Sequence, residues 1–499
     1  MSVKRPHIIL FNPDQWRGDV LGHMGNPAAV TPNLDAFART DAVSFRHAYC
    51  QNPVCTPSRC SFMSGWYPHV QGHRTMYYAM HKDDPVLLRT LKNSGYHVWW
   101  GGKNDLIAGQ EGHDDVCDVY YDAPEKVHRT WMIDKQNQWR GQTDKDNYYS
   151  FYVGQLPHTD GHDHYHDSDW ANVMGAIETI RNYDKDSDKP LCIFLPLTYP
   201  HPPYAAEAEY YDMIDPRKLP PRIPAPKDWS GYASMLKGIY QMQRLGDWDE
   251  ARWTELRRMY YAMCARVDHQ FALVMQALKD AEMYDDSAVF MFSDHGDYTG
   301  DYSVVEKSQN GFEDCLTRVP FLFKPPAEFG VKPGISDAMV ELIDMPATVE
   351  ELAGITPEHT HFGKSLLPVA TGQSNMHRDA VFCEGGRLPG EDQAMEFGPG
   401  GELRDASNLY YPRMHFQQGE GIEHHKATMC RTEHYKYIAR MSESDAFYDL
   451  DNDPFEQNNL IDHPDWQQQI NAHRLRMLHW YQQTCDVVPV KQDDRSFAK

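Results

Sequence analysis

The sequence predicts an α/β protein with a mostly parallel central sheet sandwiched by helices, followed by a smaller C-terminal α+β subdomain built on an antiparallel sheet. Four short apolar runs, rich in β-branched and aromatic residues, alternate with helix-like segments over the first three-quarters of the chain. Such runs are typical of parallel strands buried on both faces. Each run also ends near a polar or ionisable residue, as expected where parallel sheets bind ligands.

The predicted elements of the α/β part follow one another in turn along the chain. The strands are expected at "HIILF" (7–11), "GYHVWWGG" (95–102), "PLCIFLPLTY" (190–199) and "SAVFMFSD" (287–294). The helices between them are expected at "TPNLDAFART" (31–40), "PVLLRTLKNSG" (85–95) and over residues 254–281. This alternation of strand and helix favours a mostly parallel sheet.

The alternation stops at about residue 376, so we expect one domain over residues 1–375 and a second over 376–499. Within the second, antiparallel strands are expected at 426–441 and 445–453, and a final helix at 465–484. A proline-rich stretch, "DPRKLPPRIPAPKDW" (215–229), is either a plain surface loop or the border of a cleft.

Composition excludes several classes of partner. The formal charge of −24 argues against nucleic acid or an anionic membrane surface as the main partner. No run of about 18 apolar residues is present, which excludes a membrane span, and the N-terminal apolar run is too short for an export signal. The ten cysteines do not form a disulfide scaffold. We therefore expect a cytoplasmic protein with reduced thiols.

The predicted strand ends carry groups that suit a divalent cation and an anion. Asp14, Asp294 and His295 offer oxygen and imidazole ligands, which favours calcium, magnesium or manganese. For any one of them alone, the alternative is a capping or salt-bridged residue. Lys103 and Lys307 are candidate anion binders, or else solvated surface lysines.

Two further features invite a catalytic interpretation. His201 lies between prolines at a strand end, and is either a proton donor to a leaving group or a packed structural histidine. Cys55 lies in "QNPVCTPSRCSF", residues 51–62, where Pro53 and Pro57 disfavour the interior of a strand or helix. From these residues alone, Cys55 is a buried thiol, a disulfide partner, a metal ligand or a nucleophile.

The residues Cys55-Thr56-Pro57-Ser58-Arg59 resemble the Cys-x-Pro-Ser-Arg signature of type I sulfatases, in the alkaline phosphatase superfamily. Five more stretches resemble sulfatase landmarks in the family's order: "TPNLDAFA", "SDHGD", "KSQNGFEDCLTRVPF", "LIDMPATVEELAGI" and "FYDLDNDPFEQNNL". The resemblance spans nearly the whole chain. It implies an alkaline phosphatase-like fold and a hydrolase that releases inorganic sulfate from a sulfate ester, with a sulfated carbohydrate as the expected substrate.

The resemblance also implies a modified nucleophile. In this family the signature cysteine is oxidised by a formylglycine-generating maturase to 3-oxoalanine (formylglycine), whose hydrated aldehyde attacks sulfur. A sulfated thiol or serine would be a stable ester, whereas the second hydroxyl of the hydrate allows release of sulfate. Cys55 thus resembles the nucleophile, and Arg59 resembles the arginine that holds the hydrate. Cys60 is expected to be a small buried hydrophobe.

The other matched residues take their roles from the same resemblance. Cys55, Asp14, Asp294 and His295 look like ligands of one divalent metal, with Ca²⁺ expected first and Mn²⁺ or Mg²⁺ as alternatives, and Asp294 close enough to assist deprotonation. Lys103 and Lys307 resemble the two sulfate-binding lysines, and His201 the histidine near the leaving oxygen.

The chain departs from the sulfatase pattern at two site positions. Many sulfatases have two consecutive aspartates where this chain has Asp14-Gln15, although a glutamine oxygen can still ligate a metal. The family's Gly-Lys-x-His is here Gly102-Lys103-Asn104-Asp105, so Asp105 is expected to replace the histidine or contact substrate. His73 and Arg74 are further candidates for substrate recognition, because an arginine pairs with a carboxylate or a second sulfate.

Two alternatives to a sulfatase stay open. Phosphonate monoester hydrolases of the same superfamily resemble this chain at "DQWRGD", which favours a phosphonate monoester or phosphodiester hydrolase with the same formylglycine. The second alternative is a catalytically inactive relative of the sulfatases that binds anions because its Cys55 is never oxidised. The histidine-rich "HTDGHDHYHD" is a candidate site for a second metal or a substrate, but its spacing fits no familiar zinc pattern, so a solvated loop is expected. A homo-oligomer is compatible with the sequence.

Overall fold

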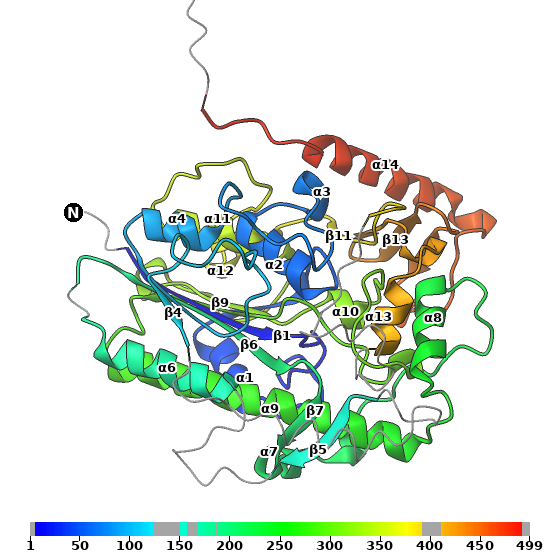
Figure 1. Cartoon of the computed structure of the whole chain (residues 1–499), viewed down its shortest axis with the longest axis horizontal. Coiled ribbons are helices and arrows are strands. Elements are labelled where there is room, and N and C mark those ends of the chain that lie inside the picture. Colours follow the sequence, from blue (N-terminus) through cyan, green and yellow to red (C-terminus); the bar gives the residue numbers. More distant parts are fainter. Residues whose placement is uncertain (1–4, 123–149, 157–167, 185–186, 392–410, 492–499) are drawn as a thin grey trace, which may run out of the picture.

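The computed structural model describes residues 5–122, 150–156, 168–184, 187–391 and 411–491. Its centre is an eight-stranded sheet with the order β10-β2-β9-β8-β1-β6-β3-β4 (Figure 1). The strands are β1 His7–Asp14, β2 Val43–Tyr49, β3 His97–Gly101, β4 Val119–Tyr121, β6 Leu191–Pro200, β8 Ser287–Phe292, β9 Phe321–Lys324 and β10 Gly334–Glu341. In this sheet only β9 runs antiparallel to its neighbours β2 and β8, so the predicted mostly parallel sheet is confirmed.

All four predicted strands are present and lie next to one another at the centre of this sheet. The runs at 7–11, 95–102, 190–199 and 287–294 correspond to β1, β3, β6 and β8. Every residue of β1 and β8 is buried, as continuous apolar runs predict for strands covered on both faces. The pattern did not predict the other four strands, which lie on either side of this central group. Strands β9, β2 and β10 follow one another beyond β8, and β4 lies beyond β3.

Helices cover both faces of the sheet (Figure 1). On one face lie α1 Pro32–Thr40, α6 Ser168–Asn182 and α9 Glu250–Asp280, whose apolar residues share one core with β1 and β6. On the other face lie α2 Cys55–Ser64, α4 Leu87–Asn93 and α11 Asp344–Ala353, which share a second core with the sheet. The predicted helix at 254–281 begins earlier, at Glu250, because the Asp249 side chain accepts a hydrogen bond from the Arg252 amide and caps it.

The C-terminal part contains a four-stranded antiparallel sheet and a long final helix. The sheet has the order β11-β12-β13-β14, with bounds Val381–Gly385, Ala427–Arg431, Tyr435–Arg440 and Ala446–Asp449. Helix α14, Gln467–Thr484, packs on it, and the rings of Trp480 and Phe382 stack 4.3 Å apart. This confirms the predicted α+β architecture, whereas the division at residues 375 and 376 stays a prediction.

Shorter elements complete the described chain. Strands β5 Tyr152–Leu156 and β7 Tyr204–Glu207 form a two-stranded parallel sheet. The remaining α-helices are α3 Pro68–Gln71, α7 Ala208–Met213, α8 Ser234–Gln243, α10 Asp314–Thr317, α12 Leu367–Ala370 and α13 Tyr411–Gln417. Within the described ranges, none of the helices has the length and apolar character that crossing a bilayer requires.

Candidate active site

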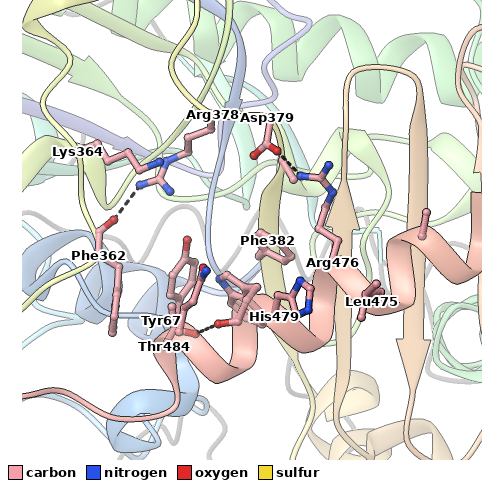
Figure 2. A pocket seen from close by; sticks show the side chains of 14 residues that line it. Tyr67, Phe362, Lys364, Arg378, Asp379, Phe382, Leu475, Arg476, His479 and Thr484 are labelled. Carbon is pink, nitrogen blue, oxygen red and sulfur yellow. Dashed lines mark hydrogen bonds and ion pairs between the residues drawn. The ribbon is translucent and has the colours of Figure 1, made fainter.

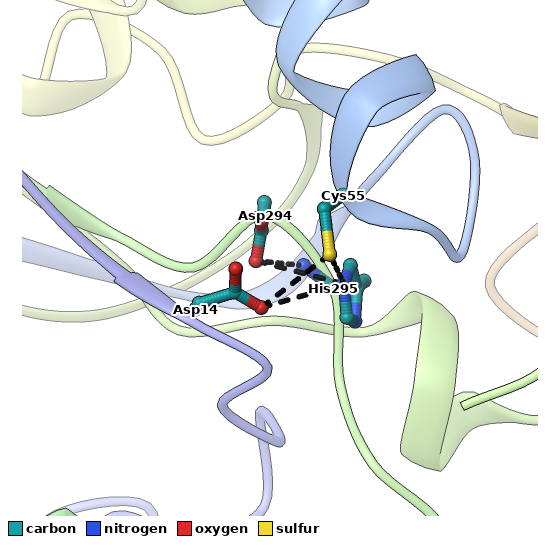
Figure 3. Close-up of side chains that lie close together, drawn as sticks. All are labelled: Asp14, Cys55, Asp294 and His295. Carbon is teal, nitrogen blue, oxygen red and sulfur yellow. Dashed lines mark hydrogen bonds and ion pairs between the residues drawn. The ribbon is translucent and has the colours of Figure 1, made fainter. Parts of the chain in front are cut away.

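Four side chains with metal-binding atoms meet at one edge of the central sheet (Figure 3). Asp14 ends β1, Cys55 is the first residue of α2, and Asp294 and His295 follow β8. All four are buried, and one ligand atom from each lies within 4.8 Å of the others. The Cys55 Sγ atom lies 3.2 Å from His295 Nε2 and 3.7 Å from Asp14 Oδ1. The strand-end residues that the sequence singled out therefore form one cluster.

The position of Cys55 follows from the local sequence. Pro57 lies in the first turn of α2, where its missing amide hydrogen costs no helical hydrogen bond, so the helix starts at Cys55. Ser58 Oγ donates a 2.6 Å hydrogen bond to the Asp294 carbonyl and ties the helix to the loop after β8. Burial, followed by the charge of Asp14, raises the pKa of the Cys55 thiol well above its usual value. Before any modification, the Cys55 side chain is therefore a protonated thiol and not a thiolate.

His295 is oriented as a metal ligand by its second nitrogen. Its Nδ1 donates a 2.9 Å hydrogen bond to the Gly296 carbonyl, which leaves the lone pair on Nε2, the atom that faces Cys55. Burial lowers the pKa of His295, so the ring is neutral, as a ligating imidazole must be.

Arg59 joins the two carboxylates of the cluster. Its Nε donates to Asp294 Oδ2 at 2.9 Å and its Nη2 to Asp14 Oδ2 at 3.0 Å. The third nitrogen, Nη1, is buried and has no hydrogen-bond partner among the described residues. Arg59 lies one turn after Cys55 on α2, so this unsatisfied donor belongs to the cluster and is available to a group bound there.

Lys103 and Lys307 approach the cluster from two different loops. Lys103, after β3, lies 2.8 Å from Asp14 Oδ2, 2.7 Å from Asp105 Oδ2 and 3.7 Å from the Cys55 sulfur. Lys307 donates to Gln15 Oε1 and Glu306 Oε1, both at 2.9 Å. Although burial opposes ionisation, Lys103 and Arg59 are among the charges that hold the pKa of Asp14 well below its usual range.

His201 forms a pair with Lys307. Its Nδ1 donates a 2.6 Å hydrogen bond to the Pro202 carbonyl, and its Nε2 accepts one of 2.8 Å from Lys307 Nζ. Burial and then the charge of Lys307 lower the pKa of His201 well below its usual value. The ring is therefore neutral here and accepts the hydrogen bond that Lys307 donates.

Gln15 lies beside the four-residue cluster. Its φ of +69° is unusual for a residue other than glycine, and its side chain is held at both ends. The amide nitrogen donates to Asp297 Oδ2 at 2.5 Å, and the amide oxygen accepts from Lys307. The ligand role of Gln15 stays a prediction.

Sequence reasoning missed the residues that hold this arrangement in place. Asp297, the last residue of the quoted "SDHGD", accepts hydrogen bonds from Gln15 and from the Tyr204 hydroxyl. Glu306 lies next to Lys307 in the sequence. Its Oε2 accepts a 2.6 Å hydrogen bond from Arg413 Nη1 on α13. No local signal identifies Arg413, because it comes from a helix that begins more than a hundred residues later.

The predicted substrate-binding residues lie farther from the cluster or are already paired. Asp105 pairs with Lys103, so it adjoins the site. Arg74 pairs with Glu391, and His73 Nδ1 donates a hydrogen bond to the Tyr78 carbonyl while its Nε2 lies 3.6 Å from Asp84. The structure brings neither His73 nor Arg74 into contact with the four-residue cluster, and their roles stay predictions. The histidine-rich stretch lies outside the described residues.

All ten cysteines are free thiols, so neither Cys55 nor Cys60 forms a disulfide. Cys60 is buried in the apolar core around α2, as expected of a small hydrophobic residue.

A cavity of about 630 Å³ lies between α14 and β11 (Figure 2). Its wall includes Arg378, whose guanidinium contacts Asp344, Glu341 and the Phe362 carbonyl. Arg476, at its rim, pairs with Asp379. Because these charges are already paired and none of the cluster residues lines the cavity, it is not the site of the chemistry predicted above.

The comparisons with known proteins agree with this geometry. The family model "Sulfatase" matches residues 6–355. Choline-sulfatase of Rhizobium meliloti is 24% identical over 97% of this chain and 89% of its own length. Ulvan-active sulfatase of Formosa agariphila is 26% identical over 93% of this chain and 78% of its own length.

Solved structures share the fold. A phosphonate monoester hydrolase of Agrobacterium radiobacter superposes with a TM-score of 0.73 over 96% of both chains, at 21% sequence identity. This similarity confirms the predicted fold. The family model covers more than half of the chain, which confirms the predicted family. The chain belongs to the sulfatase family and is a sulfuric ester hydrolase.

Proposed function

We propose that this enzyme releases inorganic sulfate from a sulfated carbohydrate, with formylglycine made from Cys55 as the nucleophile and one divalent metal, Ca²⁺, bound beside it. The observation that carries the proposal is the buried cluster of Asp14, Cys55, Asp294 and His295. Around this cluster stand two lysines and an arginine with an unsatisfied nitrogen.

The donor set fits a hard divalent cation. Two carboxylates supply oxygen atoms, His295 directs the lone pair of Nε2 at the same point, and an oxygen on the modified Cys55 would replace the sulfur. Gln15 would add an amide oxygen as a fifth ligand. Bound there, the metal polarises the sulfate oxygens and favours ionisation of the nucleophile.

The surroundings of Cys55 fit an aldehyde hydrate better than a reactive thiol. Arg59 Nη1 is a buried donor without a partner among the described residues, and a hydroxyl of the hydrate would satisfy it. The hydrate supplies one hydroxyl for attack on sulfur and a second whose deprotonation lets the sulfate leave. The maturase that makes this group is the protein partner that the proposal requires.

The remaining roles follow from charge and contact. Lys103 and Lys307 hold the sulfate oxygens from two sides, since Lys103 contacts Asp14 of the cluster and Lys307 contacts Gln15, which lies beside it. Asp294 takes the proton of the nucleophile, and the Lys307–His201 pair delivers a proton to the leaving oxygen. Asp105, with His73 and Arg74, is assigned to the sugar.

The proposed substrate class rests on local charge and on the relatives. The chain carries a formal charge of −24, yet the site concentrates Arg59, Lys103 and Lys307 in one buried region, which suits a small anion. One relative is named as acting on ulvan, and we extend that substrate class to this chain. A cytoplasmic location, and a homo-oligomer, remain predictions.

The test is a comparison of substrates on protein co-expressed with the maturase. Intact-mass measurement shows whether Cys55 has become the aldehyde, and kcat/KM is then measured for an aryl sulfate, an aryl phosphonate monoester and an aryl phosphodiester. We expect conversion and a preference for the sulfate. A preference for the phosphorus substrates by several orders of magnitude would replace the sulfatase with the phosphonate or phosphodiester hydrolase. A thiol that persists, with no turnover, would indicate an anion-binding relative.

A further inference from the structure

Lys307 belongs to a row of three buried charges that runs from the active site to α13. Its Nζ donates to Glu306 Oε1 at 2.9 Å. From the other side, Arg413 Nη1 donates to Glu306 Oε2 at 2.6 Å and also contacts Oε1. Lys307 and Glu306 are fully buried, and Arg413 is 8% exposed. One carboxylate therefore lies between two cations in the protein interior.

The order of these charges matters for the binding of an anion at Lys307. A carboxylate in contact with a buried ammonium group cancels much of its field, because charges interact strongly where water is excluded. An anion that approached Lys307 would also be repelled by Glu306. Arg413 supplies a second positive charge to the same carboxylate, so the row as a whole is positive. The charge of Lys307 can then act on a bound anion.

Glu306 is ionised and acts directly on Lys307. Although burial opposes ionisation of Glu306, the charges of Arg413 and then Lys307 lower its pKa below the usual value. Gln15 Oε1 and His201 Nε2 also accept hydrogen bonds from Lys307 Nζ, at 2.9 and 2.8 Å, and neither group carries a charge. The carboxylate of Glu306 is thus the contact that would reduce the effect of Lys307 on an anion.

The loop that carries Lys307 is also held by contacts that do not involve Arg413. The Glu306 amide donates to the Tyr204 hydroxyl at 3.1 Å. Three residues after Lys307, the Asn310 side chain donates to the His425 carbonyl of the C-terminal part at 2.8 Å. Because these bonds fix the loop at both ends, loss of the Arg413 charge should change the electrostatics of the loop more than its shape.

We propose that Arg413 is a positioning residue for anion binding, because it neutralises Glu306 and so leaves the charge of Lys307 available to the substrate. The inference rests on the proposed role of Lys307 in holding the sulfate. It adds that α13, which follows the α/β domain in the chain, sets the affinity of the site for its anion. Arg413 acts through Glu306 and Lys307 and does not itself touch the sulfate.

The test is calorimetric titration with inorganic sulfate of the full-length enzyme that carries formylglycine and Ca²⁺, at constant ionic strength. Arg413→Gln removes the charge of the side chain and keeps a hydrogen-bond donor for Glu306. We expect this variant to bind sulfate about tenfold more weakly or worse, since a charge-assisted contact at Lys307 is weakened. Arg476→Gln is the matched control, because it breaks the exposed Arg476–Asp379 pair of the C-terminal part and should bind sulfate as the wild type does.

A double variant separates the charge of Arg413 from a merely structural role. Glu306→Gln removes the negative charge and keeps an oxygen to which Lys307 can donate. When Arg413→Gln is combined with Glu306→Gln, no carboxylate opposes Lys307, and most of the lost affinity for sulfate should return. A double variant that binds sulfate as weakly as Arg413→Gln, or an Arg413→Gln variant that binds it as tightly as the wild type, overturns the proposal.

Lys307→Ala distinguishes a failure of this inference from a failure of the proposed function. It should weaken sulfate binding at least as much as Arg413→Gln does. Wild-type enzyme that binds no sulfate, or a Lys307→Ala variant that binds it as the wild type does, would refute the role of Lys307 and the inference with it. Thermal unfolding checks each variant. If Arg413→Gln fails to fold, Glu306→Gln alone decides, because it should bind sulfate at least as tightly as the wild type, and weaker binding would overturn the proposal.

Discussion

Gly102 sets the position of Lys103, and Gly102→Ala tests whether that position matters for catalysis. Gly102 has a φ of +135°, a conformation that L side chains rarely adopt, and a Cβ added there would lie 2.1 Å from the Pro196 carbonyl oxygen. The same oxygen accepts the Lys103 amide at 2.9 Å. Contacts below 3.0 Å are essentially never seen for Cβ atoms, so relief of the clash must move the Lys103 backbone by about 1 Å.

A displacement of this size in a substrate-positioning group lowers the rate by about 10²-fold. The assay is kcat/KM for an aryl sulfate on the fully modified enzyme, with circular dichroism and thermal unfolding to show that the fold persists. Gly109→Ala is the matched control, because its Cβ would meet nothing within 4 Å and no positive φ is involved. If Gly102→Ala retains wild-type kcat/KM, Lys103 does not need its observed position and its assignment to the sulfate is refuted.

Three further predictions concern the nucleophile, the metal and a buried carboxyl far from the site. Cys55→Ala should abolish turnover and leave the circular dichroism spectrum unchanged; substantial residual activity would mean that another group is the nucleophile. Removal of metal with a chelator should abolish aryl sulfate turnover, and Ca²⁺ should restore it more fully than Mn²⁺ or Mg²⁺; activity that survives metal-free dialysis would contradict the cluster's assignment. Burial raises the pKa of Asp268 to about 6, so folding favours the protonated form of this side chain. The contribution of Asp268 to the free energy of unfolding is therefore complete below about pH 4 and is lost as the pH rises through 6. The size of this effect is about 2–3 kcal/mol. In urea titrations Asp268→Asn should remove this pH dependence, and a wild-type-like profile in the variant would refute it.

The parts of the fold that were predictable are those in which one local pattern decides the outcome. Strands β1, β3, β6 and β8 are buried on both faces, so their sequences are nearly continuous apolar runs. Strand β10 alternates between partly exposed and exposed residues over its first half, and β9 is only four residues long. Neither pattern distinguishes a strand from a loop, because pairing with neighbours far away in the sequence creates both strands.

The candidate site divides in the same way. Asp14, Asp294 and His295 were predictable because the ends of parallel strands must converge at one edge of the sheet. Cys55 and Arg59 required the family signature, since nothing in an isolated Cys-x-Pro-Ser-Arg segment shows that it will start a buried helix. Arg413 was not predictable at all, because it reaches Glu306 only through tertiary packing of α13.

The arrangement of cations bears on the choice between sulfur and phosphorus. A sulfate monoester, a phosphonate monoester and a phosphodiester each carry one negative charge, so net charge does not distinguish them. They differ in their unsubstituted oxygens, because a sulfate monoester has three and the two phosphorus esters have two. Lys103, Lys307 and the proposed metal give three positive groups around Cys55, each suited to one oxygen. With a phosphorus ester one of these groups would face a carbon or a bridging oxygen and would lose its charge-assisted contact with the substrate. The three positive groups therefore favour the sulfate ester, although the fold is shared with a phosphonate monoester hydrolase.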